Sequence, residues 1–153
     1  MMKTIRVYAD TSVFGGVFDK EFISPSQSFF EQVRSGLITL FTSALVQEEI
    51  SYAPAEVREL FSVLIETMEI LDVNEPALKL RDAYLKARIV PATFSNDALH
   101  VAIASVSHCP IIVSWNFKHI VHLEKITLYN TVNILEGYSQ VSIYSPSEVI
   151  RYD

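Results

Sequence analysis

The sequence predicts an α/β fold, a three-layer α/β/α sandwich with a mostly parallel central sheet. Short apolar runs rich in β-branched residues, such as 111–113, are typical of strands that are buried on both faces. Amphipathic helical patterns separate these runs, and strands that alternate with helices favour parallel pairing. The length of 153 residues suits one domain over 1–153 with one hydrophobic core.

The first half of the chain is expected to begin with a buried strand over 5–9, because this run is β-branched and aromatic. Gly15-Gly16 predicts a loop after that strand. Ser26 or Ser28 can open a helix that Gly36 closes. The remaining elements of this half are expected as a strand over 37–41, a helix over 44–52, a helix from 54 to 68, an extended segment over 69–73 and a helix over 75–88.

The second half begins with a connector over 89–94, which Pro91 breaks. Ser95 or Asn96 is expected to cap the next helix, and Cys109-Pro110 follows its end. The later elements are expected as a strand over 111–114, helical pieces through 122 and over 127–136, a strand over 141–144 and a helical turn from 145 to 148. Right-handed crossovers then bring the carboxyl ends of the strands to one edge of the sheet.

Composition narrows the class of protein. Hydrophobic residues make up 50% of the chain and charged residues 20%, as in a compact globular protein. The mean hydropathy of +0.26 is high for a soluble chain, yet no apolar run approaches the roughly 20 residues that a membrane span needs. We therefore expect no membrane association, and a homodimer that covers apolar helix faces in the segment 57–68.

The location and the redox chemistry follow from two further observations. The chain enters its first strand without the basic and apolar regions of an export signal, which predicts a cytoplasmic protein. Cys109 is the only cysteine, so an internal disulfide and a Cys-rich zinc site are both excluded.

Acidic side chains are expected at the carboxyl edge of the sheet. Asp10 follows the first strand, Glu49 lies on the helix after the second strand, and Asp97 begins a later helix. Each acid alone also suits an ordinary role as a helix cap or a turn former. Together they repel one another unless cations neutralise them, and oxygen ligands of this kind suit Mg²⁺ or Mn²⁺. Such a site hydrolyses phosphodiester bonds.

Positive charge is scarce but locally concentrated. The net charge of −6 argues against a broad basic surface for duplex nucleic acid. Four basic residues nevertheless fall within ten positions, Lys79, Arg81, Lys86 and Arg88. This cluster either contacts RNA phosphates or forms the solvated face of a helix.

The segments that carry the acids resemble the PIN-domain ribonuclease family, which includes VapC-type toxins of toxin–antitoxin pairs. The matching segments are YADTS at 8–12, SALVQEEI at 43–50, NDALHVA at 96–102, IVSWNF at 112–117 and IYSPSE at 143–148. The resemblance implies a PIN-like fold with Asp10, Glu49 and Asp97 as the metal-binding, catalytic acids. Ser12 and Ser114 would be the hydroxyls that support this site.

The resemblance also implies a function, with one departure. It implies a metal-dependent endoribonuclease that takes RNA as substrate, serves as the toxin of a type II pair and binds an antitoxin protein. Many family members carry a fourth acid where this chain has Asn116, whose amide brings no charge. The alternative is therefore a catalytically weakened PIN-like module that binds RNA or a protein partner.

Other classes of site fit the sequence less well. A haloacid-dehalogenase-type phosphatase needs a second acid where Ser12 stands, and a dinucleotide or P-loop site needs a richer glycine loop than Gly15-Gly16. A receiver domain needs an acidic pair near the N-terminus and a lysine at a strand end, and this sequence shows neither feature clearly. His100 and His119 are expected to form hydrogen bonds within the fold rather than to bind a metal ion. For Trp115 and Tyr84 the alternatives are packing and base stacking.

Overall fold

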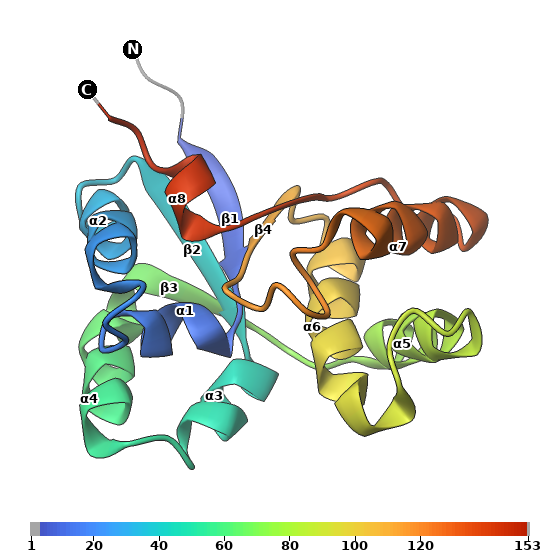
Figure 1. The fold of residues 1–153 in the computed structure, drawn as a ribbon, viewed down its shortest axis with the longest axis horizontal. Coiled ribbons are helices and arrows are strands. Elements are labelled where there is room, and N and C mark those ends of the chain that lie inside the picture. The colour runs from blue at the N-terminus through green and yellow to red at the C-terminus, as the bar shows by residue number, and fades with distance from the viewer. Residues whose placement is uncertain (1–3, 153) are drawn as a thin grey trace.

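The computed structural model describes residues 4–152, which fold around one parallel sheet (Figure 1). Its five strands lie in the order β3-β2-β1-β4-β5, and every neighbouring pair is parallel. The strands are β1 (Ile5–Ala9), β2 (Ile38–Ser43), β3 (Met68–Leu71), β4 (Ile111–Val113) and β5 (Ser142–Tyr144). The predicted α/β class is confirmed, and the sheet is wholly parallel rather than mostly so.

Helices cover both faces of this sheet. In Figure 1, α1, α2 and α4 lie on one side of the sheet and α5, α6 and α7 on the other, which gives the predicted three layers. The helices and 3₁₀ turns are α1 (Thr11–Gly16), α2 (Ile23–Arg34), α3 (Ala44–Ile50), α4 (Ala55–Leu64), η1 (Ile65–Thr67), α5 (Glu75–Lys86), η2 (Ala92–Phe94), α6 (Ser95–Val106), α7 (Leu123–Leu135) and α8 (Pro146–Val149).

The central strand β1 carries the most buried part of the sheet. Val7, Tyr8 and Ala9 are fully buried because layers of helices cover the strand on both faces. The register pairs Ala9 with Val113 of β4. The residues that follow this pair, Asp10 and Ser114, therefore leave neighbouring strands side by side at the carboxyl edge of the sheet.

Local signals fix several element ends as the sequence predicts. The Ser43 hydroxyl caps α3 by accepting a hydrogen bond from the Val46 amide at 3.2 Å. Gly36 follows α2 with a φ of +86°, a left-handed conformation that favours glycine. The last helix, α8, begins with a capping box in which Ser145 and Glu148 bond to each other's backbone.

The prediction of a loop at Gly15-Gly16 is wrong, because both glycines belong to α1. Gly16 is needed for close packing: a Cβ at this position would lie 2.5 Å from the Ser26 hydroxyl and 2.6 Å from the Trp115 ring nitrogen. Gly16 therefore allows a short helix to approach its neighbours.

Several other expected element ends also differ from the structure. The helix predicted to start at Ser26 or Ser28 starts at Ile23. Ser95 and Asn96 do not cap α6, since the η2 turn leads directly into it and Phe94 takes the cap position. The segment before His122 is a turn, and α7 begins at Leu123.

The apolar residues of the segment 57–68 divide between the core and the surface. Val57, Phe61 and Leu64 are buried against the sheet, whereas the Val63 side chain is 66% exposed. Exposed apolar side chains also occur on α7, where Leu135 is 78% exposed. Within residues 4–152, no helix has both the length and the apolar character to cross a membrane.

Candidate active site

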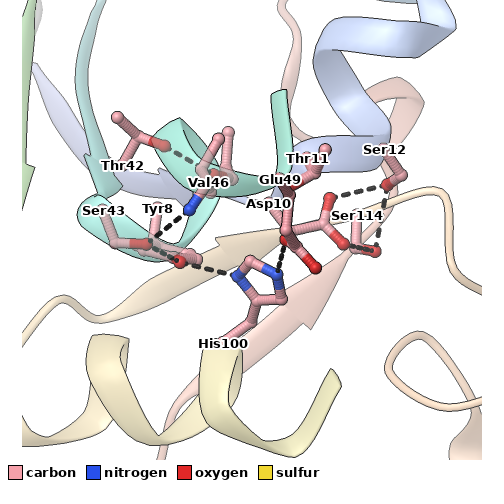
Figure 2. A network of polar contacts seen from close by, with 11 residues as sticks. Tyr8, Asp10, Thr11, Ser12, Thr42, Ser43, Val46, Glu49, His100 and Ser114 are labelled. Atoms are coloured by element: carbon pink, nitrogen blue, oxygen red, sulfur yellow. Dashed lines mark hydrogen bonds and ion pairs between the residues drawn. The ribbon is translucent and has the colours of Figure 1, made fainter. Parts of the chain in front are cut away.

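Asp10 is the most enclosed acid at the carboxyl edge of the sheet. It follows β1, is buried, and its amide donates to the Val113 carbonyl of β4 at 3.3 Å. The Ser12 hydroxyl donates to one carboxylate oxygen and the Ser114 hydroxyl to the other, each at 2.6 Å (Figure 2). The strand register explains the second contact, because Asp10 and Ser114 leave adjacent strands at the same level.

Backbone amides fix the direction of both serine protons. The Trp115 amide donates to the Ser12 hydroxyl oxygen at 2.8 Å, and the Asn116 amide donates to that of Ser114 at 2.9 Å. Since each hydroxyl accepts from an amide, its single proton is available for Asp10. The loop after β4 thus holds both serines as donors to the carboxylate.

Glu49 reaches the same region from α3 and is held through one of its oxygens. The Thr11 hydroxyl donates to Oε1 at 2.6 Å, and the His100 ring nitrogen Nε2 lies 2.8 Å from the same oxygen. On its other side the His100 ring contacts the Tyr8 hydroxyl at 2.8 Å, which lies 2.8 Å from the Ser43 hydroxyl. Figure 2 shows His100 between Tyr8 and the Glu49 carboxylate. A buried polar chain therefore joins β1, the cap of α3, and α6.

Burial is the main influence on the pKa of Asp10. Desolvation raises this pKa above its ordinary value, and the negative charge of Glu49 adds to the rise. The charge of His100 and the hydrogen bonds from Ser114 and Ser12 oppose it without cancelling it. Ionisation of the Asp10 carboxyl group therefore costs more free energy in the folded chain than in water.

The pKa of Glu49 shifts in the opposite direction. Burial alone would raise it, but the hydrogen bond and charge of His100, together with the Thr11 hydroxyl, outweigh burial and lower the pKa. Glu49 is also less enclosed than Asp10. The charge of Glu49 contributes to the pKa of Asp10, so the two acids belong to one electrostatic site.

Asp97 lies in the first turn of α6 and contacts a different histidine. Its Oδ2 atom is 2.8 Å from Nδ1 of His119, a buried residue in the loop after β4. The Asn116 side-chain oxygen accepts from the His119 amide at 3.0 Å, so the Asn116 amide group shapes the loop. Within residues 4–152, no group of three or more His, Cys, Asp or Glu side chains is gathered closely enough to hold a metal ion.

The donor chemistry of these acids nevertheless fits a hard divalent cation. Magnesium and manganese take carboxylate oxygens and water, and each carboxylate has more lone pairs than its hydrogen bonds use. No hydrogen bond from the described residues reaches Oε2 of Glu49 or Oδ1 of Asp97. Asp10 and Glu49 are the acids placed in one site, with Asp97 paired to His119 beside it.

The predicted aromatic candidates are both buried. Trp115 packs against Phe22 and donates from its ring nitrogen to the Ser26 hydroxyl at 2.9 Å. Tyr84 is enclosed between α6 and α7, where its hydroxyl donates to the Asn133 side chain. Both side chains therefore pack within the fold, and neither is placed to stack on a base.

The two histidines leave only a weak signal in the sequence. His100 follows Asp97 by three residues on one helix, which suggests a shared partner, but the two side chains contact different residues. His119 is one of several polar residues after β4. Its contact with Asp97 depends on how the loop folds back on α6.

The basic cluster occupies α5 and the turn after it. The Lys79 ammonium lies 3.8 Å from a carboxylate oxygen of Glu75, and the Arg81 guanidinium lies 2.9 Å from one of Asp82. Acids of the same helix therefore partly neutralise these two basic side chains. Lys86 and Arg88 are exposed, and Arg88 adopts a left-handed φ of 59° as the chain leaves the helix. The available positive charge is therefore concentrated at the end of α5.

The sequence matches no protein-family model and no curated protein. Solved structures share its fold. FitAcB from Neisseria gonorrhoeae is 12% identical with a TM-score of 0.59, covering 92% of this chain and 97% of its own. DNA-bound VapBC from Salmonella typhimurium is 14% identical with a TM-score of 0.58, covering 94% and 99%. VapBC2 from Rickettsia felis, bound to a promoter DNA fragment, is 15% identical with a TM-score of 0.55, covering 74% and 90%. At these identities the likeness establishes the PIN-like fold.

Proposed function

We propose that this protein is a divalent-metal-dependent endoribonuclease that hydrolyses phosphodiester bonds in RNA. The observation that carries the proposal is the buried Asp10 carboxylate, which two serine hydroxyls hold beside Glu49 at the carboxyl edge of the sheet. Ligand sites of open α/β sheets lie at this edge. The fold shared with the VapBC and FitAB structures adds support.

The residues divide the work of such a site. Asp10 and Glu49 would hold Mg²⁺ or Mn²⁺, with Asp97 beside them. Such an ion, when bound, lowers the pKa of the attacking water and stabilises the charge on the leaving oxygen. Ser12 and Ser114 fix the orientation of the Asp10 carboxylate. Thr11 and His100 hold Oε1 of Glu49, which leaves Oε2 as its oxygen for the ion.

We further propose that the protein is the toxin of a type II toxin–antitoxin pair and binds an antitoxin protein. The support is the resemblance of the acid-bearing segments to VapC-type toxins, together with the shared fold of VapBC and FitAB. An antitoxin would then cover the acids and keep RNA from them.

The second candidate function is a weakened module that binds RNA without cutting it. Two observations favour it: Asn116 stands where many PIN domains carry an acid, and Asp97 is paired with His119. Such a module would bind RNA equally well with or without manganese and would leave it intact.

Cleavage of RNA by the purified protein with Mn²⁺ separates the two functions. Asp10→Asn and Glu49→Gln should each lower the rate of cleavage about a hundredfold or more, the scale of losing a group that stabilises developing charge. Glu48→Gln is the matched control, because Glu48 is exposed on the same helix as Glu49. If either acid variant cleaves RNA like the unaltered protein, the assignment of the acids is wrong.

A further inference from the structure

Two exposed phenylalanine rings belong to segments that adjoin the candidate site. Phe94 is 41% exposed and Phe117 is 48% exposed. The Phe94 ring lies 4.4 Å, centroid to centroid, from the ring of His119, which contacts Asp97. Phe117 belongs to the loop after β4, the loop that also carries the amides bonded to Ser12 and Ser114. One ring therefore contacts the histidine that pairs with Asp97, and the other belongs to the loop that bonds to Ser12 and Ser114.

The structure braces both rings. The centroid of the Phe117 ring lies 6.0 Å from that of Trp115 and 6.2 Å from that of Phe22. The Trp115 and Phe22 rings stack on each other with their centroids 4.1 Å apart. The ammonium of Lys118 lies 5.5 Å from the centre of the Phe94 ring. The edge thus presents two supported aromatic rings together with a cation that follows Phe117 in sequence and lies over Phe94.

We propose that Phe94 and Phe117 stack on unpaired bases of an RNA strand while Lys118 contacts its phosphates. This inference rests on the proposed function and names three residues outside the acidic site that would hold its RNA substrate. Aromatic rings stack on any base that is free of its own stack, and a lysine beside them suits the phosphate backbone. Bases within a duplex are already stacked, so the same rings would not reach them. A strand held at both rings would lie next to the acidic site.

A protein segment is the competing occupant of this surface. Exposed phenylalanines also suit the apolar side chains of a protein, but such a partner gains from the cation over Phe94 only where it also places an acidic side chain there. The paired ring and ammonium favour a ligand that has flat faces and negative charge together. Unpaired RNA combines these features along its whole length.

The test compares the binding of oligouridine and of a blunt-ended RNA duplex of equal length, in which every base is paired. Fluorescence anisotropy is measured on the full-length chain in EDTA, with the RNA checked for integrity afterwards. Phe94→Leu and Phe117→Leu should each weaken oligouridine binding about tenfold, within the range of losing one stacked base, and leave duplex binding unchanged. Phe94→Tyr and Phe117→Tyr should bind oligouridine like the unaltered chain, because tyrosine keeps the flat ring.

Phe18→Leu is the matched control. Phe18 is 42% exposed, close to the value of the other two rings, but lies beside Glu59 and Val63 of α4. Its substitution should change neither affinity. Trp115, the only tryptophan, gives a second readout, because its fluorescence should change when a base stacks on neighbouring Phe117.

Several outcomes would overturn the stacking proposal. These are no binding of oligouridine by the unaltered chain, unchanged affinity in both leucine variants, or an equal loss for oligouridine and duplex. Unchanged affinity is also the result expected if a protein segment occupies the rings. The proposed function fails separately. If the leucine variants lose oligouridine while no RNA is cleaved with Mn²⁺, the stacking surface stands and the nuclease does not.

Discussion

At the scale of the residue, Asp10 shows two opposing effects on one carboxylate. Each hydrogen bond to a charged group contributes about 1.5–3 kcal/mol, and Asp10 accepts one from Ser12 and one from Ser114. Burial still raises its pKa, so removal from water outweighs both serines and the charge of His100. A carboxylate that has lost its solvating water is suited to a positive ligand, since a cation would restore the lost stabilisation.

This balance predicts how Asp10 affects stability with pH. Because the pKa of Asp10 is higher in the folded state than its ordinary value of 3.8, the folded state binds the proton more tightly. The contribution of Asp10 to stability is therefore lost as the pH rises from the ordinary pKa through the raised one. Asp10→Asn removes this loss, so the variant should gain stability relative to the unaltered chain between about pH 4 and pH 7.

Urea unfolding in EDTA at both pH values measures this difference. Glu49→Gln should show the opposite trend: the lowered pKa of Glu49 means that its contribution is present above the ordinary value and lost as the pH falls through the folded one. The exposed Glu48→Gln variant is the control for both. A gap between Asp10→Asn and the unaltered chain that stays constant with pH would contradict this explanation of Asp10.

At the scale of the element, the sequence predicts where chain segments meet better than how side chains pair. Parallel strands share one carboxyl edge, so the positions of Asp10 and Glu49 follow from the strand pattern. The partner of His100 does not, because it depends on how α6 crosses β1 and α3. The short helix α1 escapes prediction as well, since Gly15-Gly16 has low helix propensity and only the close packing at Gly16 explains it.

RNA is expected to approach the protein at the end of α5. Lys86→Glu with Arg88→Glu should weaken RNA binding and flatten its salt dependence, by a slope of about 0.7 for each phosphate charge that is no longer neutralised. The control is the double variant Lys20→Glu with Arg34→Glu, which makes the same change in charge at exposed positions elsewhere. Affinity is titrated at several salt concentrations. Equal slopes in the two double variants would mean that α5 is an ordinary solvated helix face.

At the scale of the whole molecule, the remaining exposed apolar surface bears on assembly. Most of the apolar face of α4 is buried in the core, and Val63 is what it leaves outside. The outer face of α7 carries larger apolar side chains, including Leu128 and Leu135. Both surfaces are candidates for the contact that a homodimer would bury.

The homodimer remains a prediction with α4 as its interface. Sedimentation of the unaltered chain at micromolar concentration should give a dimer, and Val63→Glu should give a monomer, because a charge in an apolar contact is costly to bury. Leu135→Glu on α7 is the matched variant and should remain dimeric. If Leu135→Glu alone separates the subunits, the interface lies on α7, and an unaltered chain that sediments as a monomer contradicts the dimer itself.

The position of β1 at the start of the chain also sets the order in which the site is completed during synthesis. Its strand is made before the others, and β2 and β3 can pair beside it while the rest of the chain is still on the ribosome. Ser114 follows Asp10 by 104 residues, so the second serine that donates to the Asp10 carboxylate emerges only after β4 has been translated. Parallel pairing across such a separation is slow, because a long loop must close first. An unfinished chain therefore contains both Asp10 and Glu49 but lacks Ser114 and the loop that orients the Asp10 carboxylate.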